Sequence, residues 1–195
     1  MFLLRFLEAV RKMKDWKKVS KYLSYILRHH PEEIGLKLDE GGWANVNELL
    51  DKSKDNGRNI SYETLKQVVR MDNKNRYSFT RGKEMIRCNQ GHSIKVDLGL
   101  EPMRPPIVLF HGTAERFKDS IIESGIKKMS RHHVHLSKDI ETAKTVGARH
   151  GKPIILKVDA QSMSEDGIKF YLSENGVWLT DYIDKKYIIK DDKDE

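Results

Sequence analysis

Three prolines near the middle of the chain, Pro102, Pro105 and Pro106, limit what this chain can fold into. Proline lacks a backbone N–H group and fixes φ, so a cluster of prolines interrupts both helices and central strands. With 195 residues in all, each side of the cluster is long enough for one small domain. We therefore predict a domain over residues 1–98, a linker over 99–107, a second domain over 108–190 and a polar tail over 191–195.

The two halves differ in charge. Residues 1–100 contain 20 Lys and Arg against 13 Asp and Glu, and residues 101–195 contain 16 of each kind, so the net charge of +7 lies in the first half. A basic surface attracts polyanions such as nucleic acids. A lysine-rich surface is also ordinary in a soluble protein, so charge alone leaves both interpretations open.

The single cysteine, Cys88, excludes an intrachain disulfide and a cysteine-based zinc site, and it fits a reducing, cytoplasmic location. No apolar run approaches the roughly 20 residues that cross a bilayer. The opening segment contains Arg5 and Glu8 and has no small-residue cleavage site, so it is typical of an amphipathic helix and not of a signal peptide. We expect a monomer without membrane association.

Apolar spacing in the first half predicts helices followed by a small hairpin. Leu3, Leu4, Leu7 and Val10 recur at helical spacing, and a second helix is predicted over 17–29, ended by Pro31. Beyond it we predict a strand over 35–38, helices over 46–53 and 61–71, and strands over 76–80 and 85–88. This order of elements is the pattern of a winged helix, a common nucleic-acid-binding module.

The second half predicts an α+β domain on a mostly antiparallel sheet. Its predicted strands cover 107–110, 134–136, 154–158, 169–172, 177–180 and 187–189, and its predicted helices cover 114–124 and 139–147. The whole chain is therefore assigned to the α+β class.

Two polar clusters of the first half are candidates for chemistry. Arg28 and His29 end a predicted helix, where cations also serve simply as caps that favour the helix dipole. Gln90, His92 and Ser93 follow a predicted strand in a turn whose donors suit a ligand, or only hold the turn itself.

Two further clusters lie in the second half. In His111-Gly112-Thr113 the glycine permits close approach of a ligand and the next helix offers N–H groups, although Thr113 could equally be an N-cap. His133 and His135 would face the same side of a predicted strand, as metal ligands can, yet no carboxylate lies at ligand spacing, so we expect no metal. Walker A, GxGxxG, GxSxG and HExxH motifs are absent from the sequence, which leaves the usual kinase, Rossmann, hydrolase and zincin interpretations without support.

Taken together, these clusters resemble the RNA 2′-phosphotransferase (tRNA 2′-phosphotransferase) family from about residue 18 to about residue 187. Each segment alone is weak, but six of them in the family's order are specific. One departure is Cys88, where the family usually has alanine. The six segments are SKYLSYILRH (20–29), NRY (75–77), QGHS (90–93), HGT (111–113), MSRHHVHL (129–136) and NGVWLT (175–180).

The resemblance implies an N-terminal winged-helix RNA lobe and a C-terminal ADP-ribosyltransferase-like lobe that holds NAD⁺. It implies that an internal 2′-phosphate of an RNA, tRNA included, attacks ribose C1″ of NAD⁺ and expels nicotinamide, giving an ADP-ribosylated phosphate. Transesterification then releases RNA with a 2′-OH and ADP-ribose 1″,2″-cyclic phosphate. The alternatives are an ADP-ribosyltransferase that caps terminal phosphates of RNA or DNA and stops after the first step, and a non-catalytic RNA-binding protein.

The resemblance also implies roles for particular residues. The family's Arg-His-Arg-Arg catalytic set matches Arg28, His29, Arg76 and Arg131, whose guanidinium groups suit a phosphate dianion. Gln90, His92 and Ser93 are expected where the lobes meet, and no metal is expected. The residues expected to bind NAD⁺ are His111, Gly112, Thr113, His133, Ser137 and Arg149.

Overall fold

The computed structural model describes the backbone of residues 2–189 and the side chains of residues 15–189. It divides into two compact units, residues 1–99 and 100–195, here called unit 1 and unit 2. Helices and antiparallel strands confirm the α+β class. The predicted polar tail and the side chains of Leu3, Leu4, Leu7 and Val10 lie outside the described residues, and no helix in the described part is long and apolar enough to cross a membrane.

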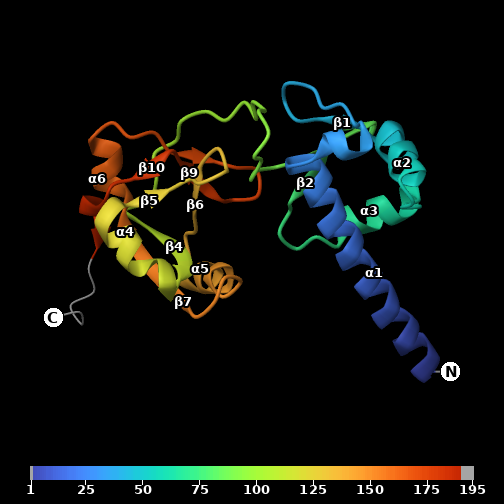
Figure 1. Ribbon diagram of the computed structural model, residues 1–195, viewed down its shortest axis with the longest axis horizontal. Helices are drawn as coiled ribbons and strands as arrows, with labels where there is room; N and C mark the ends of the chain where they lie inside the picture. Colours follow the sequence, from blue (N-terminus) through green and yellow to red (C-terminus); the bar gives the residue numbers. More distant parts are fainter. Residues whose placement is uncertain (1, 190–195) are drawn as a thin grey trace. The chain divides into compact units, whose positions relative to one another are not determined.

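Unit 1 consists of helices and one small sheet (Figure 1). Its strands follow the order β1-β3-β2, and both pairings are antiparallel. The elements are α1 (Phe2–Arg28), η1 (Pro31–Ile34), β1 (Ala44–Asn45), α2 (Val46–Asp55), α3 (Tyr62–Arg70), β2 (Tyr77–Phe79) and β3 (Met85–Cys88).

Two predictions for unit 1 are wrong. The two predicted N-terminal helices are one continuous helix, α1, because residues 11–16 contain neither glycine nor proline to interrupt it. The predicted strand over 35–38 does not form: Gly35, at φ +63°, closes η1, and the chain then runs extended so that Leu36 is buried. Alternating burial imitates a strand there.

The core of unit 1 is built on one face of α1. Leu23, Ile26 and Leu27 are fully or almost fully buried, and they belong to one cluster with Leu65 of α3 and Ile86 of β3. This packing fixes the C-terminal end of α1 relative to the hairpin that follows α3.

Unit 2 contains small antiparallel sheets with helices packed against them (Figure 1). The strand orders are β11-β7-β4, β6-β9-β8 and β10-β5. The elements are β4 (Val108–Ala114), η2 (Glu115–Phe117), α4 (Lys118–Ser124), β5 (Ile126–Lys127), β6 (Val134–Leu136), α5 (Ile140–Gly147), β7 (Pro153–Asp159), α6 (Ala160–Glu165), β8 (Tyr171–Leu172), β9 (Trp178–Thr180), β10 (Tyr182–Ile183), η3 (Lys185–Tyr187) and β11 (Ile188–Ile189).

The interpretation of Thr113 as a helix N-cap is wrong. Strand β4 continues to Ala114 because it pairs with β7 along its whole length, with Gly112 opposite Ile155 and Thr113 opposite Ile154. The α-helical part of the predicted 114–124 helix therefore begins only at Lys118.

Glycines bring α5 into direct contact with the backbone of β4. A Cβ atom on Gly112 would lie 1.7 Å from the carbonyl oxygen of Ala143, and one on Gly147 would lie 2.6 Å from that of Thr113. The absence of a side chain at Gly112 therefore serves helix-on-strand packing, which is a different reason from the ligand approach expected from the sequence.

Candidate functional site

In unit 1, the segment that follows β3 wraps around the C-terminal end of α1. The backbone N–H of Ser93 donates to the carbonyl oxygen of Arg28 at 3.0 Å, and Ser93 Oγ lies 2.9 Å from Nδ1 of His29. Gly91, at φ +86°, passes so close that a Cβ atom there would lie 3.6 Å from Nη1 of Arg28. The fold thus brings together residues from two segments that the sequence singles out separately.

Arg28 carries the clearest sign of a binding function. Its Nε and Nη2 atoms are both buried, and neither has a hydrogen-bond partner among the residues that the structure describes. These two nitrogens share one edge of the guanidinium plane and can donate two parallel hydrogen bonds to one oxyanion. Leaving a buried donor unsatisfied costs about 1–3 kcal/mol, so this edge is poised for an acceptor.

Arg76, which precedes β2, is held by the side chains of Asp72 and Asn89, neither of which was predicted as a site residue. The buried carboxylate of Asp72 accepts a hydrogen bond from the backbone N–H of Arg76 at 2.5 Å and forms an ion pair with its guanidinium group. On the other side, the backbone N–H of Asn89 donates to the Arg76 carbonyl at 2.8 Å, and Asn89 Nδ2 donates to the Asn75 carbonyl at 2.7 Å. Asp72 and Arg76 are four residues apart but lie beyond the end of α3, so the helical i, i+4 pattern gave no signal for this pair.

Cys88 shows that Arg28 and Arg76 act on one region of unit 1. Burial raises the pKa of the Cys88 thiol to about 11, although the guanidinium groups of Arg28 and Arg76 both oppose this shift. Both guanidinium charges therefore reach the same buried sulfur. Arg28, its chain neighbour His29 and Arg76 are here called the arginine cluster.

The other members of the predicted 90–93 group lie differently. His92 is 1% exposed, and its Nε2 would be 3.6 Å from a Cβ atom placed on Gly42. Gln90 is partly buried in the same turn. His92 thus packs into unit 1 itself, whereas Ser93 contacts the arginine cluster through His29.

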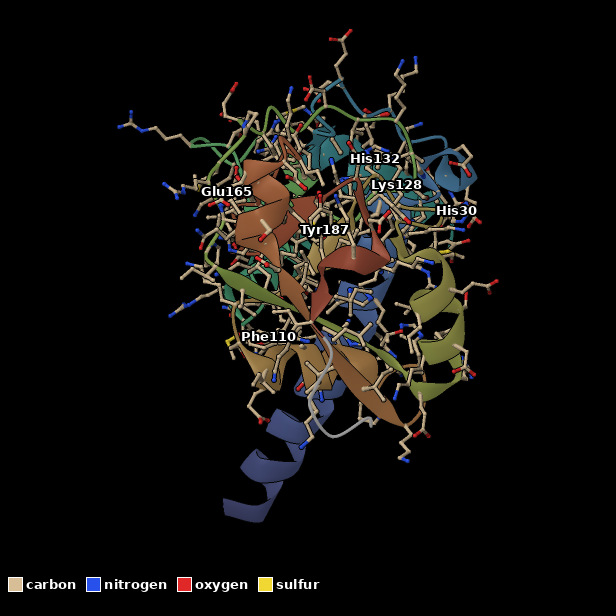
Figure 2. All side chains as sticks on the ribbon, turned by 90° about the vertical axis from the view of Figure 1, so that its left-hand side faces the viewer. His30, Phe110, Lys128, His132, Glu165 and Tyr187 are labelled. Carbon is tan, nitrogen blue, oxygen red and sulfur yellow. The ribbon has the colours of Figure 1, made fainter. Side chains whose placement is uncertain are left out.

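In unit 2, His111 and Ser137 are brought together at the junction of β4 and β6. Nδ1 of His111 donates to the carbonyl oxygen of His135 at 3.1 Å. Phe110, which is labelled in Figure 2, forms an antiparallel bridge with Ser137. Burial lowers the pKa of His111 below its ordinary 6.5, so this imidazole is neutral at neutral pH.

His133 lies just before β6, beside Tyr171 of β8. The two ring centroids are 5.5 Å apart, and burial lowers the pKa of His133, with nearby Lys128 and His132 of the same loop contributing in the same direction (Figure 2). Trp178 of β9 has a buried Nε1 with no acceptor in the described part of the chain. Neither Tyr171 nor Trp178 was predicted as a site residue, although Trp178 lies within one of the family-like segments.

The remaining predicted residues of unit 2 are spread more widely. Arg131 Nη1 lies 3.4 Å from Nδ1 of His135, and Thr113 is 8% exposed beneath α5. Arg149 is exposed in the loop after α5, and the residues that follow it line a hollow of about 230 Å³ together with residues 114–116. No metal-holding group of three or more His, Cys, Asp or Glu occurs among the described residues.

An anion with several oxygen acceptors is the ligand that the arginine cluster suits best, because guanidinium donors match carboxylate and phosphate geometry. The molecule is thus an α+β protein whose arginine cluster carries hydrogen-bond donors suited to an oxyanion. The chain belongs to the RNA 2′-phosphotransferase, Tpt1/KptA family, whose model matches residues 14–182.

Individual relatives agree with this assignment. The chain is 55% identical over 172 residues to a probable RNA 2′-phosphotransferase of Fusobacterium nucleatum, covering 88% of this chain and 96% of the relative. It is 53% identical over 173 residues to one of Nostoc punctiforme, covering 89% and 96%. It is also 54% identical over 172 residues to one of Flavobacterium johnsoniae, covering 88% and 94%.

Proposed function

We propose that this protein is an NAD⁺-dependent RNA 2′-phosphotransferase, a transferase that removes an internal 2′-phosphate from RNA. Membership of the family supports the reaction class. The observation that carries the proposal is the buried, unpartnered Nε/Nη2 edge of Arg28, since a phosphate offers the two acceptor oxygens that this edge requires. The side chains that cover this edge must move aside for a phosphate to enter.

In this proposal the arginine cluster binds the 2′-phosphate. A terminal phosphate carries about −1.5 to −2 charges near neutral pH, so one guanidinium group does not neutralise it. Arg76, oriented by Asp72, provides a second contact, and Arg131 of unit 2 provides the third guanidinium group of the family's set. Together they orient the phosphate and stabilise charge that develops during transesterification.

His29 has the geometry of a proton donor whose orientation is fixed. Ser93 Oγ lies 2.9 Å from its Nδ1 and orients the ring, and we assign its Nε2 to the substrate. It can donate a hydrogen bond to the phosphate or pass a proton to the departing RNA 2′-oxygen. We favour the second role.

NAD⁺ is the co-substrate of the proposal, and it supplies an electrophilic ribose carbon with nicotinamide as its leaving group. The proposed binding residues are His111, Gly112, Thr113, His133, Ser137 and Arg149. The uncharged imidazole of His111 and the paired rings of His133 and Tyr171 support this assignment, because they offer aromatic surfaces to the ring systems of NAD⁺. The buried Trp178 N–H adds an unsatisfied donor in the same unit.

The finer domain assignment is also part of the proposal. We assign residues 1–98 to a winged-helix RNA lobe, to which Gln90, His92 and Ser93 contribute, and residues 108–190 to an ADP-ribosyltransferase-like lobe. The order α2, α3, β2, β3 in unit 1 supports the first assignment. We propose tRNA as an RNA substrate and the cytoplasm as the location.

The direct test uses NAD⁺ and an RNA oligonucleotide, or a tRNA, with one internal 2′-phosphate. We expect loss of the phosphate, release of nicotinamide and formation of ADP-ribose 1″,2″-cyclic phosphate. Accumulation of an ADP-ribosylated RNA without cyclic product would favour the end-capping alternative instead. RNA that remains unchanged with NAD⁺ would favour a non-catalytic RNA-binding protein.

Lysine variants test the arginine cluster. Arg28→Lys, Arg76→Lys and Arg131→Lys keep the charge but lose the planar fork, and we expect single-turnover rates to fall by roughly 10²–10³, the usual effect of removing a donor aimed at developing charge. The matched control is Arg104→Lys, at an exposed arginine outside the proposed site. Near-normal rates in the three variants would refute the proposed role.

A further inference from the structure

We propose that the exposed face of α1 binds the RNA that flanks the 2′-phosphate. In this inference Tyr25 and His30 form a stacking platform for one neighbouring base, and Lys18 and Lys21 contact backbone phosphates. The inference rests on the proposed function, because the flanking RNA is located by the phosphate at Arg28.

The spacing of residues along α1 supports this placement. Lys18, Lys21, Tyr25 and Arg28 are separated by three, four and three residues, so they lie on one face of the helix with about 5–6 Å between successive Cβ atoms. The core residues Leu23 and Ile26 occupy the opposite face.

Lys18 and Lys21 are exposed. The N-terminal part of α1 extends beyond the other elements of unit 1 (Figure 1). A positive stripe therefore leads along α1 toward Arg28.

The platform consists of two rings that other contacts hold in place. The ring centroids of Tyr25 and His30 are 4.6 Å apart with planes 32° from parallel, and Tyr25 is 41% exposed. The Tyr25 hydroxyl donates to Glu33, and Nδ1 of His30 (labelled in Figure 2) lies 3.0 Å from a Glu32 carboxylate oxygen. The ring pair thus needs little reordering to accept a third ring.

Charge decides which part of the RNA binds where. The carboxylates of Glu32 and Glu33 lie against the platform, and they repel a phosphate but not the uncharged face of a base. The lysines farther along α1 attract the phosphates of the adjoining nucleotides. A base between a bound 2′-phosphate and a lysine-bound backbone is the occupant that meets both conditions.

Binding without NAD⁺ tests the platform independently of turnover. We would measure fluorescence anisotropy of labelled RNA that carries one internal 2′-phosphate, with Tyr25→Ala and the matched variant Tyr25→Phe. Stacking on an aromatic side chain contributes roughly 5- to 150-fold in affinity per base, so we expect at least a loss of about fivefold for Tyr25→Ala. Tyr25→Phe should bind like the wild type.

An abasic nucleotide beside the 2′-phosphate completes a thermodynamic cycle. When the missing base is the one that stacks on Tyr25, the abasic RNA should bind the wild type as weakly as intact RNA binds Tyr25→Ala. The abasic RNA should bind Tyr25→Ala no more weakly still. If Tyr25→Ala loses as much affinity for RNA that is abasic on either side as for intact RNA, the effect is structural and the platform is overturned. Unchanged affinity in Tyr25→Ala would also overturn it.

The lysine contacts are tested by salt dependence. Removing two lysine–phosphate contacts reduces the magnitude of the slope of log K against log salt by about 1.4 for single-stranded RNA. Between 50 and 200 mM salt, the wild type should therefore lose roughly sevenfold more affinity than Lys18→Gln/Lys21→Gln. Lys37→Gln/Lys54→Gln, at two exposed lysines elsewhere in unit 1, is the control and should match the wild type. Equal slopes in both double variants would overturn the contacts.

Two further measurements keep the alternatives apart. A 2′-phosphorylated dinucleotide is too short to reach Lys18, so its conversion with NAD⁺ reports the proposed function alone. A wild type that converts the dinucleotide but shows none of the binding effects would remove only the α1 inference. Unchanged RNA affinity in Lys18→Gln/Lys21→Gln, with lost binding to phosphatidylserine-containing vesicles, would assign the face to a lipid surface and overturn the RNA contacts.

Discussion

Gly112→Ala separates a packing role of Gly112 from a ligand-binding role. The new Cβ atom would lie 1.7 Å from the carbonyl oxygen of Ala143. An ordinary contact begins near 3.4 Å, so the backbone of α5 would have to move by about 1.7 Å, and backbone cannot rotate away as a side chain can. Asp139 caps α5 by accepting from the N–H of Thr142 at 2.7 Å, which resists such a shift.

Overpacking typically costs about 1–3 kcal/mol and occasionally more, and this overlap belongs at the upper end. For a unit of 96 residues (100–195), a change of 3 kcal/mol corresponds to a fall in Tm of roughly 12–24 °C. Differential scanning calorimetry measures this fall, and hydrogen exchange in β4 and β7 shows whether it originates in unit 2. A Gly112→Ala protein with the wild-type Tm and reduced NAD⁺ affinity would refute the packing argument.

Gly82→Ala is the matched control. Its Cβ atom would lie 2.2 Å from a carboxylate oxygen of Glu84, a contact almost as short as that of Gly112. The obstructing atom is the end of a flexible side chain, so rotation of Glu84 removes the clash and we expect a loss below about 1 kcal/mol. A large loss of stability in Gly82→Ala would mean that a short contact distance destabilises the protein whether the contacted atom belongs to the backbone or to a flexible side chain.

Three other predictions concern buried polar groups. Asp72→Asn keeps the side-chain shape but removes the charge that pairs with Arg76; we expect at least a tenfold lower single-turnover rate and a loss of about 1.5–3 kcal/mol in urea unfolding, and a normal rate would contradict the positioning role. Burial lowers the pKa of His111 below 6.5, so in acid the unfolded chain takes up a proton that the folded chain does not. The free energy of unfolding should therefore fall as pH drops below about 6.5, by up to about 1.4 kcal/mol per pH unit. His111→Asn should reduce this dependence on pH. Cys88, fully buried with a pKa raised to about 11, should resist iodoacetamide at pH 8 until denaturant is added, and rapid alkylation of the native protein would show that the hairpin opens.

Sequence patterns predicted those elements whose pattern is local. Strands over 85–88 and 134–136 were predicted with their observed bounds because short apolar runs end at polar or turn residues there. The two-residue strands β1, β5 and β10 were missed because, unlike β8 and β11, they do not lie in a longer apolar run. Their existence depends on partners far along the chain, such as Ile86 for Ala44.

The candidate site divides in the same way. Arg28, His29 and Arg76 were identified through resemblance to a family, and the structure supplies the physical reason why two of these belong together with Ser93. Asp72 and Asn89 were not predicted as site residues, because a buried carboxylate and a buried amide are recognised by their partners, and tertiary packing sets these partners. Sequence spacing cannot reveal which donors remain unsatisfied.

The end of α1 explains why changes at Tyr25 can test the RNA inference without disturbing the arginine cluster. The backbone N–H groups of His29 and His30 both donate to the carbonyl oxygen of Tyr25, at 3.0 and 3.1 Å, and these bonds terminate the helix where Arg28 and His29 are displayed. They involve main-chain atoms only, so they persist when the Tyr25 ring is removed. The side chain points to a different use, because it is exposed while its neighbours Ile26 and Leu27 are buried in the core. If both proposals hold, α1 divides its positions according to the 3.6-residue period. The inner residues stabilise unit 1, the last residue binds the phosphate, and the outer residues bind the adjoining RNA.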